Sequence, residues 1–141
     1  MQPISFPDRR FSLYLYWVSH GLLLLRSGMT EEHGSRVDLL FTDVLWLSIP
    51  AWMNGLLIEQ GEVVETLPYL PASLHVEAAA RRVYRVIVED TQHFVVCGDV
   101  RTAEDQLGYF EQSALLPGLL MPQQFSAGER RGNASVPDPR I

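Results

Sequence analysis

Most large apolar residues of this chain fall in two adjoining blocks, Arg10–Ser27 and Arg36–Pro50, where they alternate as in β-strands. One side of the first run carries Phe11, Leu13, Leu15 and Trp17, and the other carries Ser12, Tyr14, Tyr16 and Val18. In the second block Val37, Leu39 and Phe41 share one face, and Asp38, Leu40 and Thr42 share the other. The pattern therefore predicts a β-sheet core that is built early in the chain.

The interruptions between apolar runs predict where the chain turns. Ser19-His20-Gly21 stands before the strand Leu22–Arg26 and predicts a tight hairpin or a bulge. The connector Gly28–Ser35 is too polar for a core and predicts a loop. A second apolar run, Val44–Ile49, ends at Pro50, which has no N–H to donate to a strand ladder.

The middle of the chain has weaker signals. Asn54-Gly55 predicts a turn, because glycine readily adopts a positive φ, and a short strand is expected at Leu56–Glu59. The stretch Gly61–Arg82 contains two prolines and predicts an irregular segment that ends in one short helix. That helix covers Ser73–Arg82, which is rich in helix formers and begins with Ser73 as a candidate N-cap.

A clear hairpin is predicted next, with strands Val83–Glu89 and His93–Val100 around the turn Asp90–Gln92. Thr102 followed by Asp105 indicates the start of a short helix that carries Leu107 and Phe110. The alternative is a last edge strand at Leu107–Leu115, and the pattern does not choose between the two.

These elements predict an α+β fold: a single domain dominated by antiparallel β-sheet, in hairpins or a meander, with one or two short helices. A length of 141 residues fits one domain. We place that compact, β-rich domain at residues 1–118. After Pro117 the composition shifts to Gly, Pro, Asn, Ser and charged residues, so residues 119–141 are expected to be a mobile C-terminal tail.

The composition of the chain argues against several classes of protein. The chain has 17 acidic residues against 11 basic ones, a net charge of −6, which disfavours binding to nucleic-acid phosphates. No apolar run approaches the roughly 20 residues of a membrane helix, and the N-terminus lacks the pattern of a secretion signal. All basic residues are arginine, which we attribute to a GC-rich bacterial genome. With Cys97 as the single cysteine, no intramolecular disulfide can form, and we expect a cytoplasmic protein.

Few residues are candidates for catalysis or metal binding. His93 and Cys97 would lie about 13 Å apart on a strand, too far to share a metal, and Cys97 among apolar neighbours is expected to be a buried, inert thiol. Ser19 and His20 are expected to point to opposite faces, which excludes a nucleophile and base pair. The remaining candidate is a metal or acid/base cluster of His20 and His33 with Asp38 or Asp43, whose spacing is not diagnostic.

We therefore expect a protein that is not an enzyme, binds no cofactor, and has another protein or its own copy as partner, the homodimer being the favoured oligomer. It would act as a non-catalytic protein-binding module or as a homo-oligomeric structural domain. The alternative is a small hydrolase or metal-dependent enzyme that uses the histidine and aspartate cluster. Candidate contact residues are those beyond one core face, namely Tyr14, Tyr16, Leu40 and Trp52.

Overall fold

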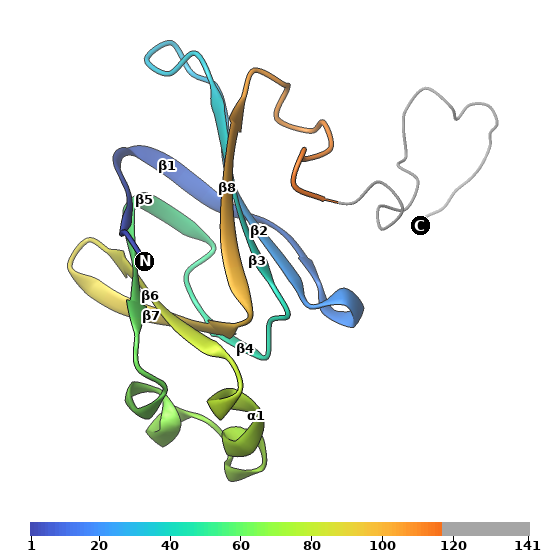
Figure 1. Cartoon of the computed structure of the whole chain (residues 1–141). Helices are drawn as coiled ribbons and strands as arrows, with labels where there is room; N and C mark the ends of the chain where they lie inside the picture. Colours follow the sequence, from blue (N-terminus) through green and yellow to red (C-terminus); the bar gives the residue numbers. More distant parts are fainter. Residues whose placement is uncertain (117–141) are drawn as a thin grey trace, which may run out of the picture. The chain divides into compact units, whose positions relative to one another are not determined.

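The computed structural model describes residues 1–116, and its central feature is an eight-stranded, fully antiparallel sheet (Figure 1). The strands are β1 (Ile4–Trp17), β2 (Leu22–Ser27), β3 (Arg36–Thr42), β4 (Trp46–Ser48), β5 (Trp52–Gly61), β6 (Arg82–Val88), β7 (Thr91–Cys97) and β8 (Asp99–Asp105). Their order across the sheet is β4-β7-β6-β5-β1-β2-β3-β8. Two meanders, β1-β2-β3 and β5-β6-β7, are joined by the pairing of β1 with β5. The predicted dominance of antiparallel hairpins is confirmed.

Helical structure in the described residues is limited to short pieces. They are the 3-10 helices η1 (Val18–His20), η2 (Val63–Glu65), η3 (Leu67–Tyr69) and η4 (Ala72–Leu74), and the α-helix α1 (His75–Ala79). The predicted helix exists but is only five residues long, and Ser73 does not cap it, because the N-cap position is Leu74. No helix in residues 1–116 has the length and apolar character needed to cross a membrane.

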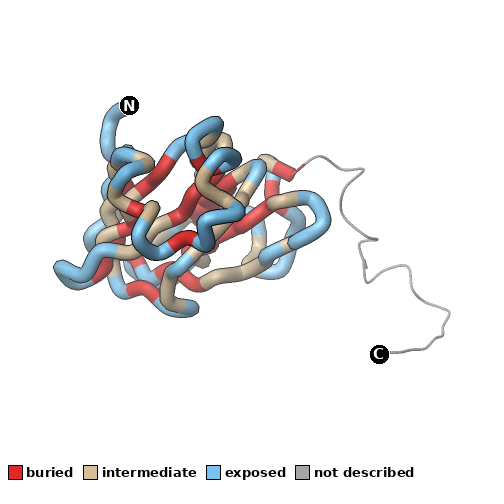
Figure 2. The backbone as a smooth tube through the Cα atoms, turned by 90° about the horizontal axis from the view of Figure 1, so that it is seen from below, coloured by how far each residue is buried: buried red, intermediate tan, exposed pale blue. Residues whose placement is uncertain are grey.

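The sheet curls so that strands far apart in its order share one core. Phe41 on β3 and Tyr84 on β6 have ring centroids 6.3 Å apart. Between these strands lie β5, β1 and β2, so a flat sheet would separate them by about 19 Å, at about 4.8 Å per strand. The enclosed core includes Phe11, Leu25, Leu39 and Met53, all fully buried. Buried and exposed positions accordingly alternate along several strands (Figure 2).

A glycine inside β5 shapes the pairing of β1 with β5. Gly55 has a φ of +78°, and a Cβ at this position would lie 2.6 Å from the carbonyl oxygen of Pro7. The register of β1 against β5 shifts between Phe6 and Arg10, opposite this glycine. The positive φ that Asn54-Gly55 suggested is therefore present, but the predicted turn is wrong, because the backbone forms a bulge within a continuous strand.

The end of the described chain also differs from expectation. The β6–β7 hairpin is confirmed with a shorter turn, Glu89-Asp90, in which both residues have a positive φ. Its second strand ends at Cys97 and not at the predicted Val100, which belongs to β8. The helix expected from Thr102 is wrong: residues 99–105 form the edge strand β8, which pairs with β3 along its whole length. Residues 107–115 are neither helix nor strand, so the alternative edge strand is wrong as well. Pairing with β3 outweighs the local helix-start signal.

The chain divides into one unit of residues 1–109 and a second of residues 110–141. In the second unit, Ser113 accepts hydrogen bonds from the backbone N–H groups of Leu115 and Leu116. The predicted domain boundary at residue 118 and the predicted tail, residues 119–141, lie outside the described residues.

Candidate functional site

A row of facing residues crosses five strands on the side of the sheet opposite the core. It consists of Trp52 on β5, Ser12 on β1, Arg26 on β2, Asp38 on β3 and Ala103 on β8, each paired in register with the next. Their sequence neighbours Phe11, Leu25, Leu39 and Met53 lie in the core, so alternation places this row on the outer face. The candidate site is built on this row.

Arg26 and Asp38 form a buried ion pair at the centre of the row. Arg26 donates from Nε to Oδ1 of Asp38 at 2.7 Å and from Nη2 to Oδ2 at 3.0 Å. Neither side chain is exposed to solvent. Arg36 lies 3.7 Å from the same carboxylate and 2.9 Å from that of Asp105. Asp38 is thus held between two arginines, which satisfies the requirement that buried charges be paired.

The remaining contacts of Arg26 fix the position of Tyr109. Arg26 Nη1 donates a hydrogen bond to the carbonyl oxygen of Tyr109, and the hydroxyl of Tyr109 lies 2.6 Å from that of Ser12. The Tyr109 ring packs edge-on against Tyr14, with centroids 5.3 Å apart. A Cβ on Gly28 would lie 2.8 Å from the same ring, so only glycine allows this close approach. Tyr109 is therefore held through its backbone, its ring and its hydroxyl.

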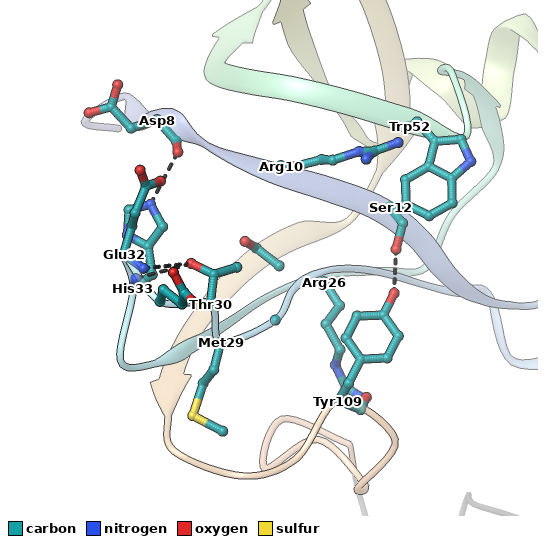
Figure 3. Close-up of a pocket in the computed structure, with 13 residues that line it drawn as sticks. Asp8, Arg10, Ser12, Arg26, Met29, Thr30, Glu32, His33, Trp52 and Tyr109 are labelled. Carbon is teal, nitrogen blue, oxygen red and sulfur yellow. Dashed lines mark hydrogen bonds between the residues drawn. The ribbon is translucent and has the colours of Figure 1, made fainter.

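A surface pocket of about 550 Å³ opens beside Tyr109 (Figure 3). Ser12 lies between Trp52 on one side and Tyr109 and Arg26 on the other. Residues 28–33 of the β2–β3 connector also line the pocket, including the exposed side chain of Met29, and Asp8, Arg10 and Ser27 complete the lining. We refer to this feature below as the Trp52 pocket. It combines two exposed apolar side chains with charged groups of both signs.

Arg10, which stacks on Trp52, supplies the positive charge on one side of the pocket. The guanidinium carbon of Arg10 lies 4.4 Å from the centroid of the Trp52 ring, a cation–π contact. Trp52 is 60% exposed, and Arg10 is exposed too. No carboxylate in residues 1–116 lies within ion-pair distance of Arg10.

The β2–β3 connector supplies negative charge on the other side of the pocket. The hydroxyl of Thr30 accepts hydrogen bonds from the backbone N–H groups of Glu32 and His33, at 3.2 and 3.1 Å. The His33 ring lies 3.1 Å from the carbonyl oxygen of Asp8 on β1. These contacts tie the connector to the edge of the pocket, where Asp8, Glu31 and Glu32 are exposed. The predicted loop is confirmed, and it is locally ordered by its own hydrogen bonds.

The structure does not bring the predicted histidine and aspartate cluster together. His20 precedes β2 and His33 follows it, and the six residues of β2 span about 16 Å. Asp38 is bound by Arg26 and Arg36, and Asp43 pairs with Arg81 at 3.0 Å. In the described part of the chain, no group of three or more potential ligands could hold a metal ion.

Ser19 and His20 are closer than expected. Ser19 Oγ lies 3.0 Å from His20 Nδ1, because both residues belong to the turn η1 and not to a strand. The expectation that they point to opposite faces is therefore wrong. The pair is exposed, and the His20 ring stacks on Trp17 with centroids 3.9 Å apart. Its ring contacts are an indole and a hydroxyl, not the carboxylate that orients a catalytic histidine.

Cys97 lies in the core and is not part of the site. Burial, together with the negative charges of Asp99 and Asp43, raises the pKa of its thiol to about 12, although a hydrogen bond to the Asp99 backbone opposes the shift. A thiol with such a pKa carries almost no thiolate at neutral pH. The expected burial of Cys97 is confirmed.

The four predicted contact residues occupy different environments. Trp52 is exposed in the pocket, Tyr16 is 37% exposed, and Tyr14 is partly buried beneath the guanidinium of Arg26, 4.2 Å from its ring centroid. Leu40 is only 1% exposed, so its side chain is not accessible. Of the four, Trp52 alone lines the pocket.

Sequence reasoning assigned no role to Arg10 or Arg26, and it named Tyr109 only among several aromatic residues that could form a contact surface. One signal was present, since Arg26 stands inside the apolar first block and Asp38 inside the second. A buried charge needs a partner, so two opposite charges in adjacent predicted strands indicate a pair once the register is known. The contacts of Tyr109, by contrast, depend on a segment without regular structure.

Comparison of the chain with models of protein families, with curated proteins and with solved structures found no match.

Proposed function

We propose that this chain is a non-catalytic protein-binding module and that its partner contacts the Trp52 pocket. The observation that carries the proposal is the 60% exposure of Trp52 beside a pocket that also presents Arg10, Tyr109 and Met29. Tryptophan, tyrosine and arginine are the residue types that dominate binding energy at protein interfaces. An exposed tryptophan in such company is better explained by a partner than by the stability of the isolated chain.

The organisation of the pocket supports binding without rearrangement. Tyr109 is fixed by Arg26 and Ser12, and the stacking of Arg10 on Trp52 orders both side chains. Side chains that are ordered before association lose less conformational entropy when a partner binds. The volume of about 550 Å³ is within the range of about 300–1,000 Å³ typical of ligand pockets.

The polar groups of the pocket favour a binding role over a catalytic one. Asp38, the ion-pair partner of the pocket-lining Arg26, is bound by two arginines and has no exposed surface from which to accept a substrate proton. Among the described residues, His33 is the one histidine that lines the pocket, and its ring contacts a backbone carbonyl. The described lining therefore offers no serine or cysteine that is paired with a histidine base.

A random dodecapeptide library displayed on phage tests the proposal directly. Peptides are selected on the full chain, synthesised, and titrated by calorimetry into the wild type and Trp52→Ala. The control is Tyr69→Ala, which removes an aromatic side chain that is 66% exposed on η3. Thermal unfolding of each variant checks that it remains folded.

We expect Trp52→Ala to weaken the selected peptides by about 30-fold, the effect of a hot-spot residue of about 2 kcal/mol, and Tyr69→Ala to leave their affinity unchanged. The proposal fails if the peptides bind Trp52→Ala as tightly as the wild type. Sedimentation distinguishes another protein from a second copy of this chain as the partner. A wild-type dimer that dissociates on Trp52→Ala would mean that a second copy occupies the pocket.

A further inference from the structure

We infer that the partner segment presents a carboxylate to Arg10 and a basic side chain to the connector acids Glu31 and Glu32. This inference rests on the proposed function and specifies the chemistry of the partner. Its basis is the separation of charge within the Trp52 pocket. Figure 3 shows Arg10 beside Trp52 on one side, and Asp8 and Glu32 beside the connector on the other.

Arg10 differs from every other arginine in the described residues. Each of the others has a carboxylate within 4.0 Å, namely Arg9, Arg26, Arg36, Arg81, Arg82, Arg85 and Arg101. The Arg10 guanidinium stacks on the face of Trp52, and within residues 1–116 its N–H donors have neither an ion-pair partner nor a hydrogen-bond acceptor. A planar, stacked guanidinium with open donors suits a carboxylate, which it can bind through two parallel hydrogen bonds.

The connector presents the opposite charge in a defined position. The Thr30 hydroxyl holds the backbone at Glu32 and His33, and the His33 ring contacts β1. Glu31 and Glu32 are exposed, and no arginine in the described residues lies within ion-pair distance of either. An acidic pair alone would not define a site, but here it borders the same pocket as Arg10 and Trp52.

This arrangement selects against partners of a single charge. A polyacidic segment would meet Arg10 but would be repelled by Asp8, Glu31 and Glu32, and by the net charge of −6. A purely basic segment would face the uncompensated charge of Arg10. Complementary potentials favour a peptide that carries both charges, with an apolar or aromatic residue between them against Trp52 and Met29.

The first test uses the peptides whose affinity depends on Trp52. Each is titrated into the wild type, Arg10→Gln, and the control Arg101→Gln, whose side chain is 62% exposed on β8. We expect Arg10→Gln to weaken binding by about 10- to 100-fold, as for loss of a charged hydrogen-bonded pair, and Arg101→Gln to have no effect. Arg10 is exposed, so the substitution should not unfold the chain; the thermal midpoint checks this.

The peptide is then changed in the matching position. One arm replaces its Asp or Glu by Asn or Gln, and a second amidates its C-terminus, so a side-chain carboxylate is distinguished from a terminal one. The peptide change that removes the carboxylate bound by Arg10 should weaken binding to the wild-type chain as much as Arg10→Gln does. The same peptide change should not further weaken binding to the Arg10→Gln variant. Peptides that depend on Trp52 but are indifferent to Arg10→Gln would overturn the inference and leave the proposed function intact.

The acidic side has its own variant. Glu31→Gln/Glu32→Gln should weaken peptides with a basic residue several-fold, and Glu77→Gln, a change in an exposed acid on α1, should not. Tighter binding to Glu31→Gln/Glu32→Gln than to the wild type would contradict the inference that a basic side chain of the partner faces these two acids.

Discussion

Arg26 and Asp38 lie directly opposite each other on β2 and β3 and are joined by two hydrogen bonds with no solvent exposure of either side chain. Removing two charges from water costs free energy, and their mutual attraction offsets that cost only when the other donors and acceptors are satisfied. Arg26 meets this condition through the carbonyl oxygen of Tyr109, and Asp38 through Arg36. The pair thereby links the sheet to the wall of the Trp52 pocket.

Loss of the Asp38 carboxylate should be strongly destabilising, because it leaves Arg26 buried without its partner. We expect Asp38→Ala to lower the free energy of unfolding by about 3–5 kcal/mol. The control, Asp99→Ala, removes a carboxylate from exposed ion pairs with Arg82 and Arg101 and should cost less than about 1 kcal/mol. Urea denaturation measures both, and equal losses for the two variants would mean that Asp38 does not hold a buried charge.

The β6–β7 turn should be open to stabilisation. Glu89 and Asp90 have φ angles of 50° and 66°, a conformation that Asn-Gly adopts with less strain. Glu89→Asn/Asp90→Gly should raise the free energy of unfolding by about 0.5–2 kcal/mol. The thermal midpoint of unfolding reports the change. A lower midpoint would mean that the native side chains make stabilising contacts which outweigh the backbone strain.

The stability of the fold should decrease at low pH because Asp105 becomes protonated. Burial alone would raise the pKa of this carboxyl, but hydrogen bonds from Arg36 and from the backbone of Leu107, with the nearby positive charges, lower it below its ordinary value of 3.8. A group with a lowered folded-state pKa stabilises the protein above pH 3.8, and this contribution is lost as the pH falls through the folded-state pKa.

Asp105→Asn should therefore be less stable than the wild type at pH 7, and the difference should shrink as the pH is lowered toward 3. Unfolding free energies measured across this pH range test the prediction. A difference that stays constant would show that Asp105 stabilises the fold without its charge.

Gly28 should be sensitive to substitution because of Tyr109. A methyl group at Gly28 would meet the Tyr109 ring at 2.8 Å, whereas one at Gly34 would have no neighbour within 4 Å. We expect Gly28→Ala to cost about 1–3 kcal/mol through overpacking, and Gly34→Ala to change the stability by less than about 0.5 kcal/mol. If the two variants unfold at the same urea concentration, Tyr109 does not pack against Gly28.

Much of the fold followed from local patterns. Alternation of apolar residues located β3, β6 and most of β1, and continuous apolar runs located β2 and β7, because at least one face of each strand meets the curled core. Errors arose where tertiary pairing decided the outcome: Gly55 forms a bulge opposite Pro7, and the Thr102 segment pairs with β3. A residue that favours a positive φ can lie in a turn or in a bulge, and a helix-start signal can lie in a strand. Such local signals do not by themselves specify the secondary structure.

The site was harder to predict than the fold, since it depends on register. Trp52, Ser12 and Arg26 come from three separate segments and meet only because β1 pairs with both β5 and β2. Tyr109 belongs to an irregular segment, so no periodicity could place it. The predicted cluster required the connector to fold back so that His33 approaches His20, whereas β2 separates the two residues along its full length.

Binding at the Trp52 pocket is tested most directly by the response of the tryptophan indole signals to a bound peptide. The chain has three tryptophans, which give three indole N–H resonances in a proton–nitrogen correlation spectrum. Trp17 stacks on His20 and Trp46 packs beside the cluster around Val96, both outside the lining of the pocket. Titration with a peptide selected on the full chain should shift the Trp52 resonance and leave those of Trp17 and Trp46 in place. A shift of the Trp17 or Trp46 resonance with an unchanged Trp52 resonance would show that the peptide binds elsewhere on the chain and not at the Trp52 pocket.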